Sequence, residues 1–145
     1  MKGMSIIVKK VSQLIAGIIF IYGIYIITHG HLTPGGGFAG GVIIAGAYIL
    51  LILAFGSDIV GLKSKESGTS FTESISILIV LLIAVAALFI GTKIFFTNYL
   101  PKGNLGDIIS AGTIPLYNIF VGIEVAAAIL TIFLALIIFK EEIKK

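Results

Sequence analysis

The segment Phe38–Phe55, FAGGVIIAGAYILLILAF, contains 18 consecutive residues without a charged side chain. An α-helix of this length is about 27 Å long, close to the hydrocarbon thickness of a bilayer. Three further apolar runs, 11–28, 75–97 and 116–139, are interrupted by at most one charged residue each. The sequence therefore predicts a single all-α membrane domain, residues 1–145, an integral bundle of four transmembrane helices over about 11–28, 38–56, 73–98 and 114–139.

The composition agrees with this class and excludes several others. Of the 145 residues, 58% are hydrophobic and 12% are charged, whereas a soluble domain has about 25% charged residues. Because there is no cysteine, a disulfide, a thiol nucleophile and a cysteine-ligated zinc or iron–sulfur site are excluded. The chain carries no P-loop, Gly-x-Ser-x-Gly or His-Glu-x-x-His motif. We therefore expect an accessory subunit, not an enzyme, with no catalytic residues, no bound cofactor and no metal.

The distribution of lysine predicts the orientation in the membrane. The net charge of +3 comes from lysine alone, and cytoplasmic flanks of membrane helices collect such residues. With four spans, the two termini and the connection 56–72 share one side of the membrane. That side holds eight of the ten lysines: Lys2, Lys9, Lys10, Lys63, Lys65, Lys140, Lys144 and Lys145. We expect a multi-pass protein of the plasma membrane with both termini cytoplasmic and no nucleic-acid partner.

The connection between the first two spans is the most unusual part of the chain. Residues 28–41 read THGHLTPGGGFAGG. Pro34 disfavours a helical conformation at the preceding residue, and the following glycines allow backbone angles that other residues rarely adopt. One interpretation is an anion or carbonyl contact at a helix N-terminus, or proton transfer by His29 and His31. The other is a tight reversal followed by close helix packing.

Glycine spacing favours the packing interpretation. Gly37, Gly41 and Ala45 recur every four residues, as do Gly36 and Gly40, which creates a groove for a neighbouring helix. Two imidazoles without a nearby third ligand make a poor metal site. The predicted packing motif consists of Pro34, Gly35, Gly36, Gly37, Gly40 and Gly41.

Glu124 is a carboxylate inside the fourth predicted span. Nine residues separate it from Pro115, so it lies about 13 Å inside the helix. A charged residue at such a depth is costly and is expected to face protein, water or a partner charge. Tyr117 and Thr131 lie seven residues to either side and share its face of the helix. The three residues predict a polar stripe, and they are candidates for an ion path.

Lys93 is the basic residue inside a predicted span. It lies near the outer end of the third helix, where its side chain can extend to the membrane surface. Alternatively, it pairs with Glu124, either as part of a proton relay or to neutralise a buried charge. Either residue could instead pair with another subunit.

Three segments together resemble one family. Gly30–Gly41, GHLTPGGGFAGG, resembles the Gly-His-x-x-Pro-Gly-Gly-Gly-Phe-x-Gly-Gly hallmark of the MnhB (MrpB-type) subunits of Mrp-type multisubunit sodium/proton antiporters. Gly91–Thr97, GTKIFFT, is similar to the Gly-Lys-x-Phe-Phe-Thr element of that family, with Thr92 between the first two residues. Pro115–Asn118 and the following span resemble its last helix.

The resemblance implies a place in a larger machine. In that family larger subunits carry the main proton channels, and MnhB lines or supports the sodium-handling part. The same type of subunit is implied in archaeal respiratory complexes that join an Mrp-like module to a hydrogenase or sulfur reductase. Glu124 departs from the antiporter pattern, which favours the respiratory variant.

The expected partners are therefore other membrane subunits of an Mrp-like module, hydrogenase or sulfur-reductase subunits and the lipid bilayer, with Na⁺ and H⁺ as transported ions. The alternatives are an MnhB subunit of a stand-alone antiporter, a purely structural spacer and an independent small carrier.

Overall fold

The computed structural model describes residues 3–56, 62–90, 94–104, 106–108 and 110–143. Within these residues the secondary structure consists of four helices: α1 (Ile6–Thr28), α2 (Gly36–Phe55), α3 (Leu62–Phe89) and α4 (Ile114–Ile143). All four are long and apolar enough to cross a membrane. The prediction of an all-α, four-span bundle is therefore confirmed.

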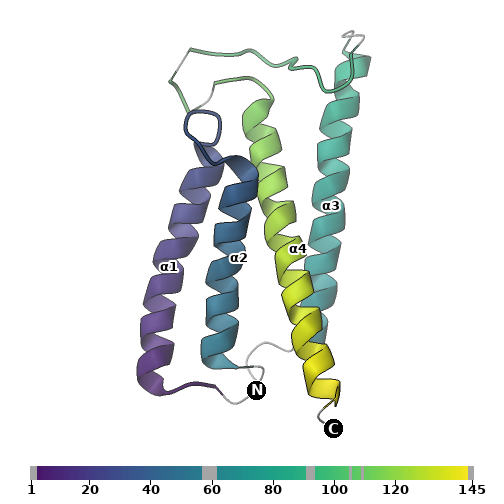
Figure 1. The fold of residues 1–145 in the computed structure, drawn as a ribbon. Helices are drawn as coiled ribbons and strands as arrows, with labels where there is room; N and C mark the ends of the chain where they lie inside the picture. Colours follow the sequence, from purple (N-terminus) through teal and green to yellow (C-terminus); the bar gives the residue numbers. More distant parts are fainter. Residues whose placement is uncertain (1–2, 57–61, 91–93, 105, 109, 144–145) are drawn as a thin grey trace.

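The helices lie side by side in the order α1, α2, α4, α3 (Figure 1). Helix α2 packs between α1 and α4, and α3 packs mainly against α4. The chain passes up α1, down α2, up α3 and down α4. The start of α1, the end of α2, the start of α3 and the end of α4 therefore share one end of the bundle, and the opposite ends of the helices share the other, which we call the outer end after the orientation predicted from the sequence.

Local signals explain where α1 and α2 begin and end. The Ser5 side chain caps α1 by accepting a hydrogen bond from the backbone N–H of Val8, 3.5 Å away. Gly35 and Gly36 have positive φ angles of 142° and 79° and turn the chain into α2. At the other end of α2, Gly56 has a φ of 82°, and a glycine with positive φ commonly terminates a helix.

Helix α3 differs most from the expected range of 73–98. It covers Leu62–Phe89, so Glu73 lies well inside the helix and not at its start. Hydropathy places the span over the apolar run and leaves out the polar segment before it. Within the helix the hydroxyl groups of that segment are satisfied by the preceding turn: Thr72 donates to the carbonyl of Gly68 and Ser74 to that of Ser70. The expected helix at 94–98 is absent, since residues 94–96 form a bend and a turn and residues 97 and 98 have no regular structure.

The outer faces of the bundle are apolar. Large side chains such as Ile6, Leu14 and Phe89 are 79%, 70% and 86% exposed. Helix α3 is the least covered, with 17% of its most apolar window buried, compared with 33% for α4. In a membrane such surfaces face lipid or neighbouring subunits.

Candidate functional site

Glycines let α2 approach α4 closely at the outer end. The backbone N–H of Gly37 donates a hydrogen bond to Oδ1 of Asn118, 3.3 Å away. A Cβ atom on Gly37 would collide with the backbone carbonyl of Asn118, and one on Gly41 would lie 2.5 Å from the backbone oxygen of Gly122. The two helices therefore touch backbone to backbone.

The other face of α2 makes the same kind of contact with α1. A Cβ atom on Gly40 would lie 2.8 Å from the backbone oxygen of Gly23 and would collide with Ile27. Ile27 also reaches α4, where its Cδ1 atom lies 2.5 Å from the position of a Cβ on Gly122. Glycines on two faces of α2 thus hold α1 and α4 on either side of it.

The reversal before α2 also depends on glycine. A Cβ atom on Gly30 would collide with the Cα atom of Gly36 and lie 2.9 Å from Nδ2 of Asn118. The left-handed φ angles of Gly35 and Gly36 disfavour other residues there. Pro34 is exposed in the turn just before them.

The two histidines have separate surroundings. The ring of His29 stacks on Tyr25 with centroids 4.1 Å apart, and its Nδ1 lies 3.0 Å from the Tyr25 carbonyl oxygen. His31 instead reaches across the outer end, with Nε2 3.3 Å from the backbone oxygen of Asp107. In the part of the chain that the structure describes, no group of three or more His, Cys, Asp or Glu residues is placed to bind a metal.

Three polar atoms at the outer end are buried without a hydrogen-bond partner in the described structure: His31 Nδ1, Tyr117 OH and Asn118 Nδ2. The Tyr117 ring stacks on Phe96 with centroids 5.1 Å apart. Buried polar atoms of proteins nearly always have a partner, often water. A partner for each of these three atoms would have to come from water, an ion or a neighbouring chain.

A second asparagine, Asn98, closes the long connection before α4. Its Nδ2 donates to the backbone oxygen of Ala111 at 2.9 Å, and its Oδ1 accepts from the backbone N–H of Thr113 at 3.0 Å. Sequence reasoning missed this residue. Asparagine in a Gly-rich connection is a general turn signal and does not reveal a partner thirteen or more residues away.

One residue of the predicted polar stripe of α4, Thr131, contacts α3 through the hydroxyl of Thr69. Counting alternately by four and three residues from this contact gives the residues expected on the facing sides of the two helices, and we call this set the α3–α4 seam. It comprises Thr113 just before α4, then Tyr117, Phe120, Glu124, Ala127 and Thr131 on α4, and Thr69, Glu73, Ser76, Val80, Ile83 and Ala87 on α3. All twelve are buried or partly buried, and the spacing is that of helices packed in register.

One contact fixes the register of this seam. The hydroxyl oxygens of Thr69 and Thr131 lie 2.9 Å apart, and that of Thr131 is also 2.9 Å from the carbonyl oxygen of Ala127. Glu124 is partly buried two turns further along the same stripe. Thr69 was not identified from the sequence as a partner of this stripe.

The expected pairing of Lys93 with Glu124 involves a residue outside the described part of the chain. Within the described part, the carboxylate of Glu124 forms no hydrogen bond or ion pair. The pairing therefore stays a prediction.

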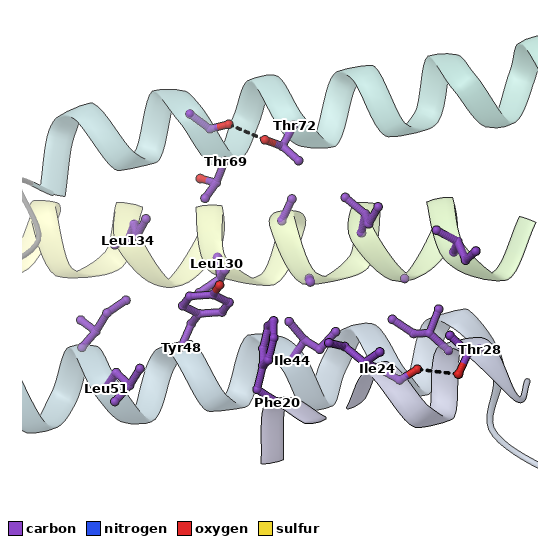
Figure 2. Close-up of a pocket in the computed structure, with 18 of the residues that line it drawn as sticks. Phe20, Ile24, Thr28, Ile44, Tyr48, Leu51, Thr69, Thr72, Leu130 and Leu134 are labelled. Atoms are coloured by element: carbon purple, nitrogen blue, oxygen red, sulfur yellow. Dashed lines mark hydrogen bonds between the residues drawn. The ribbon is translucent and has the colours of Figure 1, made fainter. Parts of the chain in front are cut away.

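An apolar cavity of about 1090 Å³ lies beside the seam. Residues of all four helices line it, and Figure 2 shows Phe20 of α1 and Tyr48 of α2 projecting toward α4, with Thr69 and Thr72 on α3. Its floor on α4 includes the small residues Gly122, Ala126 and Ala127. Small residues on α4 thus leave room that larger side chains would fill.

The fold and the glycine contacts at the outer end define the class of protein. It is a small all-α integral membrane protein whose second helix is held between the first and the fourth by glycine contacts. The sequence model of the family described as "Domain related to MnhB subunit of Na+/H+ antiporter" matches residues 7–131. The chain belongs to this family, which confirms the resemblance noted in the sequence.

Curated relatives extend over most of the chain. A Staphylococcus aureus (strain Newman) protein assigned as antiporter subunit mnhB2 is 33% identical over 141 residues, covering 94% of this chain and 96% of that protein. An uncharacterized protein of Methanocaldococcus jannaschii is 37% identical over 132 residues. That match covers 86% of this chain but 49% of the relative, so the chain spans about half of that protein's length.

A solved structure gives a further comparison. A chain of the membrane-bound sulfane sulfur reductase, an archaeal respiratory membrane complex, is 29% identical to this chain, with a TM-score of 0.63. The match covers 89% of this chain and 56% of that chain. The four-helix unit is thus found in both antiporter subunits and a respiratory complex.

Proposed function

We propose that this chain is a non-catalytic integral subunit of a multisubunit cation-translocating membrane complex, in which an Mrp-like sodium/proton exchange module is coupled to a membrane-bound reductase or hydrogenase. The observation that carries the proposal is the match to a chain of the archaeal sulfane sulfur reductase complex over 89% of the present chain. The thinly covered helix α3 supports it, because an apolar helix packed on one side leaves room for neighbouring subunits.

Within such a complex the chain has a packing role and an ion-handling role. The packing role belongs to Gly37, Gly40 and Gly41, whose contacts hold three helices together. The ion-handling role belongs to Glu124 with Tyr117 and Thr131 on its helix. At the outer end, His31 has an unpartnered ring nitrogen suited to contact water or a proton donor.

Membership of a stand-alone sodium/proton antiporter, as its MnhB subunit, is the second candidate. It is favoured by the Staphylococcus relatives, whose full length the chain nearly matches, at 96% of the S. aureus (strain Newman) protein. The two candidates differ in their partners, since only the first includes redox subunits.

Purification of the tagged chain from its native membranes in a mild detergent tests the proposal. We expect other multi-pass subunits to co-purify in fixed ratio, together with reductase or hydrogenase subunits. Multi-pass subunits without redox partners would favour the antiporter. A chain that purifies alone, and that moves ions by itself in vesicles, would contradict both.

A further inference from the structure

The apolar cavity of about 1090 Å³ runs along the helices. Its lining extends from Gln13 to Thr28 on α1 and from Ile119 to Leu134 on α4, fifteen positions in each case. At 1.5 Å per residue this is about 22 Å, whereas one leaflet of the hydrocarbon core is about 15 Å thick. Figure 2 shows Thr28 toward one end of the cavity and Leu51 and Leu134 toward the other. The cavity is therefore long enough for a lipid chain that lies parallel to the helices.

The cavity is open to the surface of the bundle. Helix α3 packs mainly against α4 and leaves the space beside α1 and α2 unfilled. Ile24, Tyr48 and Ile123 line the cavity and are 43%, 45% and 40% exposed. Apolar cavities of proteins exclude water, and the walls of an empty cavity lose dispersion contacts. In a membrane, an apolar component of the surroundings therefore fills this space.

The size of the cavity argues against a helix as its occupant. A membrane helix with its side chains is about 10–12 Å across, so about 22 Å of its length fills roughly 1700–2500 Å³. The cavity, at about 1090 Å³, is too small for it. The hydrocarbon chains of a lipid are narrower and flexible, and they adapt to irregular walls.

A lysine lies at the inner end of the cavity, opposite the outer end. The Nζ atom of Lys9 is 5.8 Å from the ring centroid of Phe55, which lines the cavity. Lys9 shares a face of α1 with the lining residues Gln13 and Phe20, four and eleven positions later. Within the part of the chain that the structure describes, the Lys9 ammonium forms no ion pair. It has three hydrogen-bond donors for an anion.

We propose that the cavity binds a phospholipid, with its hydrocarbon chains along the cavity and its phosphate at the Lys9 ammonium. Basic residues at the ends of membrane helices bind lipid headgroups of negative charge. Chain burial alone gains little in a bilayer, because lipid tails are as apolar as the cavity walls. The charge contact at Lys9 therefore distinguishes this lipid from the lipids on the rest of the surface. The proposal is independent of the proposed function, because it concerns this chain alone.

Lipid retained through purification tests the site. We expect native mass spectrometry of the full-length chain in mild detergent to show a phospholipid-bound form. Lys9→Gln should lower the bound fraction several-fold, because it removes the charge at the phosphate, and Lys9→Arg should keep it. Lys10→Gln is the matched control and should also keep it, because Lys10 is exposed and lies on a neighbouring face of α1.

Three results of this measurement would overturn the site. The first is an unaltered chain without bound phospholipid, and the second is an equal bound fraction in the Lys9→Gln and Lys10→Gln variants. The third is a second copy of the chain bound in place of lipid. Because the chain is measured by itself, each result is distinguishable from failure to co-purify with a complex.

A photoactivatable lipid tests where the chains lie. The chain is reconstituted with phosphatidylglycerol that carries a diazirine on an acyl chain, and it is repurified in detergent before illumination. We expect adducts on cavity residues such as Phe20, Tyr48 or Leu130. Adducts confined to outward residues such as Leu14 and Leu136, which are 70% and 63% exposed, would contradict the proposal. Loss of the adducts in excess inorganic phosphate would also contradict it, since the free anion would then suffice.

Discussion

The hydroxyl oxygens of Thr69 and Thr131 lie 2.9 Å apart across two antiparallel membrane helices. Each hydroxyl also lies near a carbonyl oxygen of its own helix, that of Glu66 at 3.0 Å for Thr69 and that of Ala127 at 2.9 Å for Thr131. A hydroxyl donates one hydrogen, so Thr69 donates to the Glu66 carbonyl and accepts from Thr131, while Thr131 divides its hydrogen between Thr69 and the Ala127 carbonyl. The contact aligns α3 with α4, and both hydroxyl groups keep a hydrogen-bond acceptor.

A double-mutant cycle should detect this contact. We expect Thr69→Val and Thr131→Val to show a coupling free energy of about 0.5–1 kcal/mol, the range measured for hydrogen bonds between membrane helices. Unfolding in mixed detergent micelles gives the four free energies of unfolding that the cycle requires. Strictly additive effects would mean that the two hydroxyls do not interact.

Alanine at Gly41 should weaken the bundle. Its Cβ atom would lie 2.5 Å from the backbone oxygen of Gly122 and 2.9 Å from Cβ of Val125, so the helices must separate. We expect a loss of about 1–3 kcal/mol in the free energy of unfolding, typical of overpacking. Gly46→Ala on the same helix is the control, because nothing lies within 4 Å of its Cβ position. Equal effects of the two substitutions would contradict the close approach of α2 and α4.

Removal of the Asn118 side chain should loosen the start of α2. Asn118→Ala deletes the acceptor of the Gly37 N–H bond, and we expect a loss of about 1–2 kcal/mol. Hydrogen exchange at the Gly37 amide should rise as well. Asn104→Ala, at an exposed position, should leave both measurements unchanged. Slow exchange at Gly37 in the Asn118 variant would show that the bond is unimportant.

The orientation of the chain in the membrane can be tested at Lys102. This residue is exposed in the connection between α3 and α4. The connection lies at the end of the bundle opposite the one to which eight of the ten lysines are assigned. We predict that a maleimide that does not cross membranes labels Lys102→Cys from outside intact cells. The chain has no other cysteine, so the signal is specific. Labelling that requires permeabilised cells would show that the chain has the opposite orientation.

Four spans could be predicted from the sequence because each apolar run is long enough by itself to cross a bilayer. The extent of α3 could not be predicted from the sequence, because hydropathy ranks Thr69, Thr72 and Ser74 as polar and places them outside the span. In the helix their hydroxyls bond to carbonyl oxygens three or four residues earlier. Such local bonds lower the cost of placing these residues in a membrane.

The candidate site was predictable only in part. Glu124, Tyr117 and Thr131 share a helix face by spacing alone, and this face lies on the seam. Their partners on α3 depend on the register of two helices, which is a contact between distant parts of the chain. Asn118 was likewise not identified as a partner of Gly37, because 81 residues separate them.

The measurement that tests the central claim most directly is sodium-dependent transport by the assembled complex carrying Glu124→Gln. Glutamine keeps the size of the side chain but removes its charge. If the chain takes part in ion handling, the complex should assemble with its normal subunits while its sodium-dependent transport falls at least about tenfold, equivalent to about 1.4 kcal/mol. Normal assembly together with transport at the unaltered rate would contradict an ion-handling role and leave the chain as a structural spacer.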